Sequence, residues 1–151
     1  MAKFKFRLQS VLSYKEQVEE ALKMELAQLQ EAHQRELLAL QELEGEKAHT
    51  ARALQREEER EQLDLAAIEL HVAYLDILEE AIVSQTSLVQ ELEERLTRKR
   101  EEVIVAMQER KALEKLRDRE AWRAALEERR MEGKLIDEVA TARFGRERSI
   151  L

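Results

Sequence analysis

Hydrophobic residues in the second half of the chain recur with the period of a coiled-coil helix. Steps of alternately three and four residues lead from Leu75 to Leu113, and nine of the twelve positions visited are apolar. This period keeps one stripe of a helix facing a partner helix. The three polar interruptions, Gln85, Lys99 and Arg110, are of the kind that lowers coiled-coil stability but helps to fix register. The twelve positions are Leu75, Leu78, Ile82, Gln85, Val89, Leu92, Leu96, Lys99, Val103, Ala106, Arg110 and Leu113.

The first half carries a stripe with a different spacing. Its positions repeat every eleven residues, which corresponds to about 3.67 residues per turn and favours a straight or slightly right-handed winding. Because the two stripes differ in pitch, we expect the helices to pack together over limited stretches and to leave some apolar positions free for other contacts. The positions are Val11, Lys15, Val18, Leu22, Leu26, Leu29, His33, Leu37, Leu40 and Glu44.

A break of phase between the two stripes predicts a turn at about 58–66. Asp64 is a suitable N-cap for the helix that follows. Gly45 is a rival turn site, but a lone glycine costs a helix only about 1 kcal/mol, so an uninterrupted first helix is preferred. The sequence therefore predicts a single all-α domain, 1–151, folded as an antiparallel coiled-coil hairpin and monomeric by itself. Its parts are a first helix at about 4–57, a second helix at about 66–144, and a frayed basic tail to 151 that Gly133 and Gly145 mark.

Composition supports helices and excludes most other folds. The chain has no proline, no cysteine, three glycines and six aromatic residues, and 39% of its residues are charged. Sheets with many turns need glycine and proline, and globular cores need more aromatic area. Without cysteine there is no thiolate nucleophile or thiolate metal site. No apolar run approaches the ~20 residues that span a bilayer, and the N-terminus has no signal-peptide pattern, so we expect a soluble cytoplasmic protein.

Motifs for catalysis, metal binding and nucleic-acid binding are missing or weak. Glu46 and His49 have the spacing of one half of a helix-bundle di-iron motif, but the second half and its extra glutamates are lacking. Basic clusters near Arg98 and Arg129 are mixed with glutamates, which is typical of a solvated helix face rather than a nucleic-acid surface. We expect no enzyme activity, no metal, no cofactor, no small-molecule substrate and no nucleic acid. The basic, aromatic segment Lys3–Arg7 is expected to dock on the second helix or a partner, with a membrane surface as the alternative.

Charge is distributed unevenly along the predicted hairpin. Residues 1–15 have four basic and no acidic side chains, and residues 139–151 have three arginines against one glutamate. Residues 51–100 have seven basic and twelve acidic side chains, although the net charge of the whole chain is only −7. The open end of the hairpin is therefore basic and the turn end acidic, which suits contact with two different partners.

Four segments together resemble the FliJ family, the small coiled-coil proteins of the bacterial flagellar type III export apparatus. They are residues 4–16, 74–78, 110–116 and 134–140. The resemblance implies an antiparallel coiled coil similar to the stalk of the rotary ATPase gamma subunit. It also implies insertion into the hexameric export ATPase (FliI-like), stimulation of that ATPase, a link to the cytoplasmic domain of the export gate subunit FlhA, and escort of export chaperones. The location implied is the cytoplasmic side of the inner membrane at the flagellar base.

The resemblance also implies two contact sites. The gate contact corresponds to Tyr74, Leu78, Ala81 and Gln85, although Leu78 and Gln85 also belong to the second-half stripe. By charge and by analogy with the gamma stalk, the ATPase contact is expected at Arg117, Arg119, Trp122, Arg123, Arg129 and Arg130. Two alternatives remain open. A scaffold coiled coil would form a parallel dimer, and a rotary ATPase central-stalk subunit would carry a globular domain between its helices.

Overall fold

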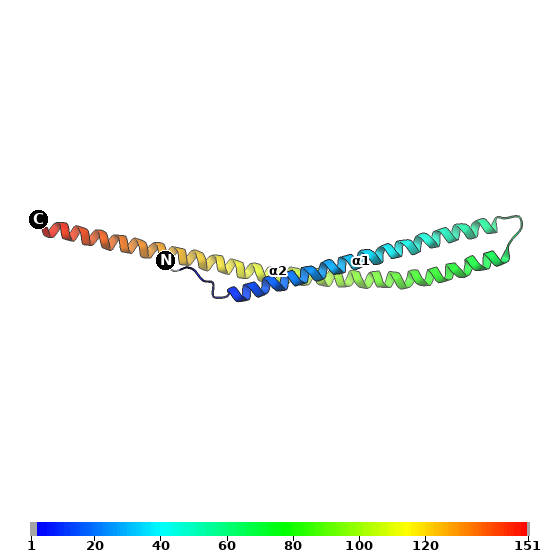
Figure 1. Ribbon diagram of the computed structural model, residues 1–151, viewed down its shortest axis with the longest axis horizontal. Helices are drawn as coiled ribbons and strands as arrows, with labels where there is room; N and C mark the ends of the chain where they lie inside the picture. Colours follow the sequence, from blue (N-terminus) through cyan, green and yellow to red (C-terminus); the bar gives the residue numbers. More distant parts are fainter. Residues whose placement is uncertain (1–2, 151) are drawn as a thin grey trace. The chain divides into compact units, whose positions relative to one another are not determined.

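The computed structural model describes residues 3–150, and this part of the chain consists of two long α-helices without a strand (Figure 1). Helix α1 is Gln9–Glu58 and helix α2 is Leu65–Ile150. The predicted all-α helical hairpin is therefore confirmed. Met1, Ala2 and Leu151, which the single-domain prediction includes, lie outside the described residues.

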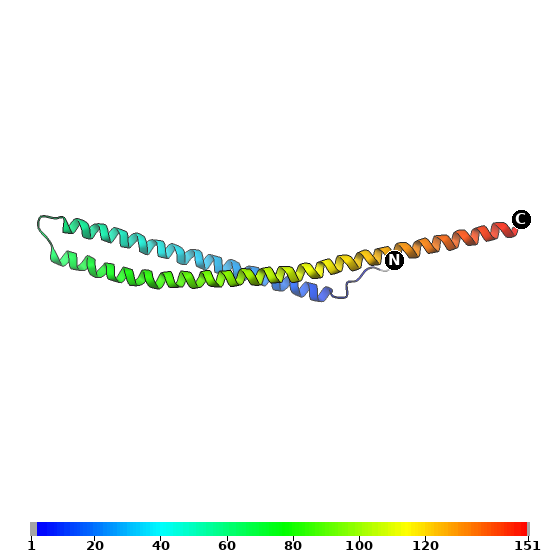
Figure 2. The same cartoon turned by 180° about the vertical axis from the view of Figure 1, so that it is seen from behind.

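The contacts within the chain fall into two compact units. The loop unit is Glu20–Ile104, and the terminal unit combines the described residues up to Glu19 with those from Val105 onward. In the loop unit, α1 and α2 lie side by side and run in opposite directions, joined by residues 59–64 (Figures 1 and 2). Helix α1 passes Gly45 without a break, as predicted.

Local hydrogen bonds border the short loop between the helices on both sides. At the end of α1, the backbone amide of Glu59 donates to the carbonyl oxygen of Gln55 at 3.1 Å. At the start of α2, the amide of Ala67 donates to Asp64 Oδ1 at 3.3 Å, which satisfies one of the amides that a helix N-terminus leaves unpaired. The prediction of Asp64 as N-cap is confirmed, and the loop lies within the predicted range.

The predicted seam of α2 is confirmed at every position. All twelve of its side chains are buried or half-buried. The most deeply buried apolar members are Leu78, Val89, Leu92, Leu96, Val103 and Ala106. In each unit, the 3.5-residue period therefore directs one face of α2 into the contact with α1.

The eleven-residue winding predicted for α1 is wrong. Its buried and half-buried positions include an unbroken heptad series with the same period as the α2 seam, while Val11 and Glu44 are exposed. The error has a physical cause: polar side chains, among them the buried Glu19 and Thr50, occupy positions of the series, so the apolar residues alone misreport its pitch. We expected the helices to pack over limited stretches because of a difference in pitch. Since the two periods match, this reason for limited packing does not apply within either unit. The series is Leu12, Lys15, Glu19, Leu22, Leu26, Leu29, His33, Glu36, Leu40, Leu43, Lys47, Thr50, Leu54 and Glu57.

Helix α1 begins at Gln9 and not near residue 4 as predicted. Lys3–Phe6 has no regular structure, and the amide of Gln9 donates to the carbonyl oxygen of Phe6 at 3.1 Å as the helix starts. Phe6 is buried, and Phe4 lines a hollow together with Ala121, Ala124 and Ala125 of α2. Small alanine side chains leave room for an aromatic ring, so this segment contacts α2 instead of extending α1. The expected docking on the second helix is confirmed.

Helix α2 continues to Ile150, past Gly133 and Gly145, where a frayed tail was predicted from about residue 144. A glycine costs a helix about 1 kcal/mol, which strong helix formers on either side offset. Every side chain from Glu127 to Ser149 is exposed. This stretch of the terminal unit is a helix with accessible surface on all sides.

Candidate functional site

The three polar interruptions of the α2 seam each meet a carboxylate of α1. In the loop unit, Gln85 Nε2 donates to Glu36 Oε2 at 2.7 Å and to the Glu36 carbonyl oxygen at 2.8 Å. Lys99 Nζ donates to Glu25 Oε2 at 2.8 Å, and it also pairs with Glu102 at 2.8 Å. These bonds satisfy polar groups that would otherwise weaken the contact between the helices.

The terminal unit repeats this arrangement with arginine. The guanidinium of Arg110 donates to the buried carboxylate of Glu19 and to Glu114 Oε1 at 2.8 Å. Lys15 Nζ of α1 donates to Glu109 Oε2 of α2 at 2.8 Å. The hydrogen bond that Lys15 donates to Glu109 raises the pKa of Lys15, and the bonds to Glu19 and Glu114 raise the pKa of Arg110. Both cations therefore stay charged at neutral pH.

The described part of the chain meets neither the requirements of a metal site nor those of a membrane-spanning helix. Over residues 3–149, no three His, Asp or Glu side chains are placed to hold a metal ion. Neither α1 nor α2, as far as they are described, contains a stretch long and apolar enough to cross a membrane. The candidate functional residues are therefore the side chains on exposed helix faces.

The four residues of the expected gate contact are divided between the seam and the surface. Leu78 is 4% exposed and lies in the core, and Gln85 is held by Glu36. Tyr74 is exposed, and its hydroxyl donates to Glu46 Oε1 at 3.4 Å. Burial of the ring, together with the charge of Glu46, raises the pKa of Tyr74. Tyr74 and the half-buried Ala81 are thus the two members that offer surface to a partner.

A second heptad stripe, which the sequence analysis missed, includes Tyr74 and Ala81. We call it the outer stripe, and each member from Tyr74 onward precedes a seam position by one residue, so its spacing is also four and three. The signal was present in the sequence as exposed apolar residues between seam residues. Tyr74 and Ile77 also line a shallow hollow with Leu70, His71 and Ala73. The members of the outer stripe are Leu70, Tyr74, Ile77, Ala81, Ser84 and Leu88.

Acidic residues surround the outer stripe. Residues 61–94 include no lysine or arginine. The stripe ends where its next two positions, Glu91 and Arg95, form an ion pair at 2.9 Å. The acidic residues of this stretch are Glu61, Asp64, Glu69, Asp76, Glu79, Glu80, Glu91, Glu93 and Glu94.

All six residues of the expected ATPase contact lie on α2 in the terminal unit. Arg117 is half-buried and its Nε lies 3.7 Å from Asp118 Oδ1. Trp122 is 65% exposed, which is unusual for so large an apolar side chain. The other four members, Arg119, Arg123, Arg129 and Arg130, are exposed.

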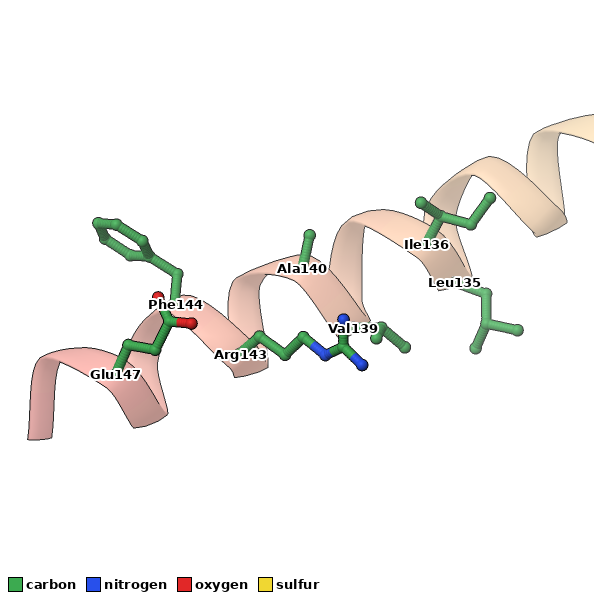
Figure 3. Close-up of a pocket in the computed structure, with 7 residues that line it drawn as sticks. All are labelled: Leu135, Ile136, Val139, Ala140, Arg143, Phe144 and Glu147. Carbon is green, nitrogen blue, oxygen red and sulfur yellow. The ribbon is translucent and has the colours of Figure 1, made fainter. Parts of the chain in front are cut away.

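Beyond these residues, α2 carries an apolar face that the sequence analysis placed in the second helix but did not single out as a contact surface. Figure 3 shows Ile136, Ala140 and Phe144 in one row along the helix and Leu135, Val139 and Arg143 in another. All six side chains are exposed. The Arg148 guanidinium lies 5.6 Å from the centre of the Phe144 ring, a cation–π arrangement. We call this the distal face.

The comparisons with known proteins identify the family. Neither the curated proteins nor the solved structures give a match. The family model described as the flagellar FliJ protein matches residues 4–149. Because this match covers both helices and the N-terminal segment that contacts α2, the chain belongs to the FliJ family.

Proposed function

We propose that this chain inserts into the hexameric flagellar export ATPase, stimulates it, links it to the cytoplasmic domain of FlhA, and escorts export chaperones. Membership of the FliJ family makes it a component of flagellar protein export, and this family is not a known enzyme family. The observation that carries the proposal is the stretch of α2 from Glu127 to Ser149, in which every side chain is exposed.

A bare helix suits the centre of a ring of subunits. A helix packed in a hairpin offers only its outer face, whereas a helix surrounded by subunits needs contact residues around its whole circumference. Arg119, Arg123, Arg129 and Arg130 supply guanidinium groups that pair well with carboxylates, and Trp122 supplies apolar area. One helix cannot contact six identical subunits equally, so it favours nucleotide-bound closure in some subunits over others.

The gate contact is assigned to the loop unit. Tyr74 and Ala81 offer surface there, and Leu78 and Gln85 support them from the seam by holding α2 against α1. This division means that a change at Leu78 acts through folding, whereas a change at Tyr74 acts through contact. Binding to FlhA would place the protein at the cytoplasmic side of the inner membrane.

Contacts within the chain favour this function over the two alternatives. The polar pairs of the seam, such as Lys99 with Glu25 and Gln85 with Glu36, join α1 and α2 of one chain, which supports a monomer rather than a parallel dimeric scaffold. The helices of the loop unit are joined by residues 59–64, which is too short for the globular domain of a central-stalk subunit.

Titration of the cognate export ATPase with this protein tests the proposal. We expect higher ATP turnover and a higher yield of hexamer. The double reversal Arg129→Glu with Arg130→Glu should reduce the stimulation about tenfold, because charge-assisted pairs become repulsions, while binding to FlhA is retained. The matched control is Arg98→Glu with Arg100→Glu, a second exposed arginine pair on α2. Unchanged turnover and unchanged hexamer yield with the wild-type protein would refute the proposal.

A further inference from the structure

In the loop unit, helix α2 has two hydrophobic stripes but only one neighbouring helix. The seam at Leu75, Leu78 and Ile82 faces α1. The outer stripe, displaced by one residue, lies beside it on the helix surface and remains accessible, with Ile77 62% exposed. Heptad spacing is what keeps a stripe aligned with a second helix over several turns. An exposed stripe with this spacing fits a further helix better than it fits a loop or a flat surface.

The charges around the outer stripe define the kind of helix. Glu69, Asp76 and Glu80 lie on its solvent side. On the side of α1, Glu46 is held near the stripe by its hydrogen bond from Tyr74. No lysine or arginine of α2 offsets these carboxylates between residues 61 and 94. A helix with acidic flanks would be repelled here, and one with basic flanks would be attracted.

We propose that the outer stripe binds a basic amphipathic helix of a partner protein, which packs beside α1 and α2 as a third helix. The inference rests on the proposed gate contact and deepens it by stating the form of the partner segment. That segment is α-helical, with apolar side chains at alternating three-residue and four-residue spacing and with lysine or arginine on its flanks. A second copy of this chain would bring the same acidic surface, and an anionic membrane would also be repelled, so neither suits the stripe.

The length of the stripe gives the length of the partner helix. From Leu70 to Leu88 the helix rises about 27 Å at about 1.5 Å per residue, or about five turns. The Glu91–Arg95 ion pair ends the apolar surface on one side. A partner helix of about 18 to 20 residues therefore covers the stripe.

Binding of two synthetic helical peptides to the full chain tests the inference directly. The peptides share one apolar stripe with heptad spacing and differ only in having lysine or glutamate flanks, and binding is followed by fluorescence anisotropy. We expect the lysine peptide to bind, more weakly as salt rises, and the glutamate peptide not to bind. Ile77→Gln should weaken binding of the lysine peptide about tenfold or more, because an isoleucine contact is lost.

The matched control is Val83→Gln. Val83 is 70% exposed on the same helix, and lies about 120° around the helix from Ile77. This change should leave binding within about twofold, since a side chain off the stripe makes no contact with the peptide. Circular dichroism of both variants checks that the helices are intact, which is expected because Ile77 and Val83 are exposed.

The cytoplasmic domain of FlhA, measured with the same variants, separates the two proposals. If the lysine peptide binds in a way that depends on Ile77 but the FlhA domain does not bind, the inference is supported and the gate contact is refuted. Binding of the FlhA domain that is unaffected by Ile77→Gln refutes the inference, as does equal binding of both peptides or of neither. Self-association or binding to anionic vesicles that depends on Ile77 would also overturn it.

Discussion

Replacement of Leu12 by alanine should strongly destabilise the terminal unit. Leu12 is 0% exposed, and it is the largest fully buried side chain among the residues whose side chains are described. The change removes three carbon atoms, and at about 0.8 kcal/mol for each buried methylene this amounts to about 2.4 kcal/mol. The cavity left behind adds to this cost by an amount that depends on how far the neighbouring side chains collapse into it. The total is about 3 kcal/mol of unfolding free energy.

Urea denaturation followed by far-UV circular dichroism measures the loss, and amide hydrogen exchange locates it. We expect protection to fall in the terminal unit, where Leu12 lies, before it falls in the loop unit. Leu38→Ala is the matched control, because Leu38 is an α1 leucine that is 49% exposed. It should cost about 1 kcal/mol or less. A loss below about 1 kcal/mol for Leu12→Ala would refute the assignment of Leu12 to the core of this unit.

Two further changes test the cap and the ion pairs. Asp64→Ala should cost about 1 kcal/mol in urea denaturation, because the Ala67 amide loses its acceptor, whereas Asp64→Asn should cost much less; equal losses would contradict the capping role. Hydrogen bonds with Glu102 and Glu25 raise the pKa of Lys99 above 10.5, so its contribution to stability is complete below that pH and is lost as pH rises through the folded-state pKa. The melting temperature should therefore fall above about pH 10.5. This fall should be less steep for Lys99→Met than for the control Lys111→Met, which changes an exposed lysine. An identical dependence of melting temperature on pH in the two variants would contradict the role of Lys99.

The two helices differed in how well the sequence predicted their packing. In α2, apolar residues occupy nine of twelve seam positions, so the period could be read directly. In α1, Glu19, Glu36 and Lys47 occupy seam positions, where they meet polar or charged groups of α2. Because their partners lie between 32 residues (Lys47 to Glu79) and 91 residues (Glu19 to Arg110) away in sequence, a local apolar pattern could not reveal them, and neighbouring apolar residues suggested a false pitch.

The candidate contact residues were predicted less completely than the fold. The family resemblance pointed to Leu78 and Gln85, but the seam already uses both side chains. Ile77 lies next to the seam residue Leu78, so a search for a single heptad stripe does not single it out. Whether an apolar residue faces α1 or the outside depends on a phase difference of one residue, and that phase is fixed only when the partner helix is in place.

The polar pairs also explain how two such repetitive helices find one alignment. A shift of one heptad would preserve most apolar contacts in either unit, so the apolar residues alone barely select the register. The same shift would place Arg110 at the level of Leu12 or Leu26, Lys99 at the level of Val18 or Ala32, and Gln85 at the level of Leu29 or Leu43. Each shifted arrangement leaves a polar or charged group against hydrocarbon, which costs more than the correct pairing.

This selection of register bears directly on the proposed contact with the export ATPase. In the terminal unit, α2 is covered by α1 and by the segment that precedes α1. This cover ends near the hollow that Phe4 and Ala125 line, and α2 continues beyond it alone. A shift of one heptad would cover or uncover about 10 Å of α2, at about 1.5 Å per residue. Arg129 and Arg130 lie at the level of this hollow, between Glu128 and Met131, which line it. The pairing of Arg110 with Glu19 therefore sets how much of the bare helix, and which of its arginines, a surrounding ring of subunits would meet.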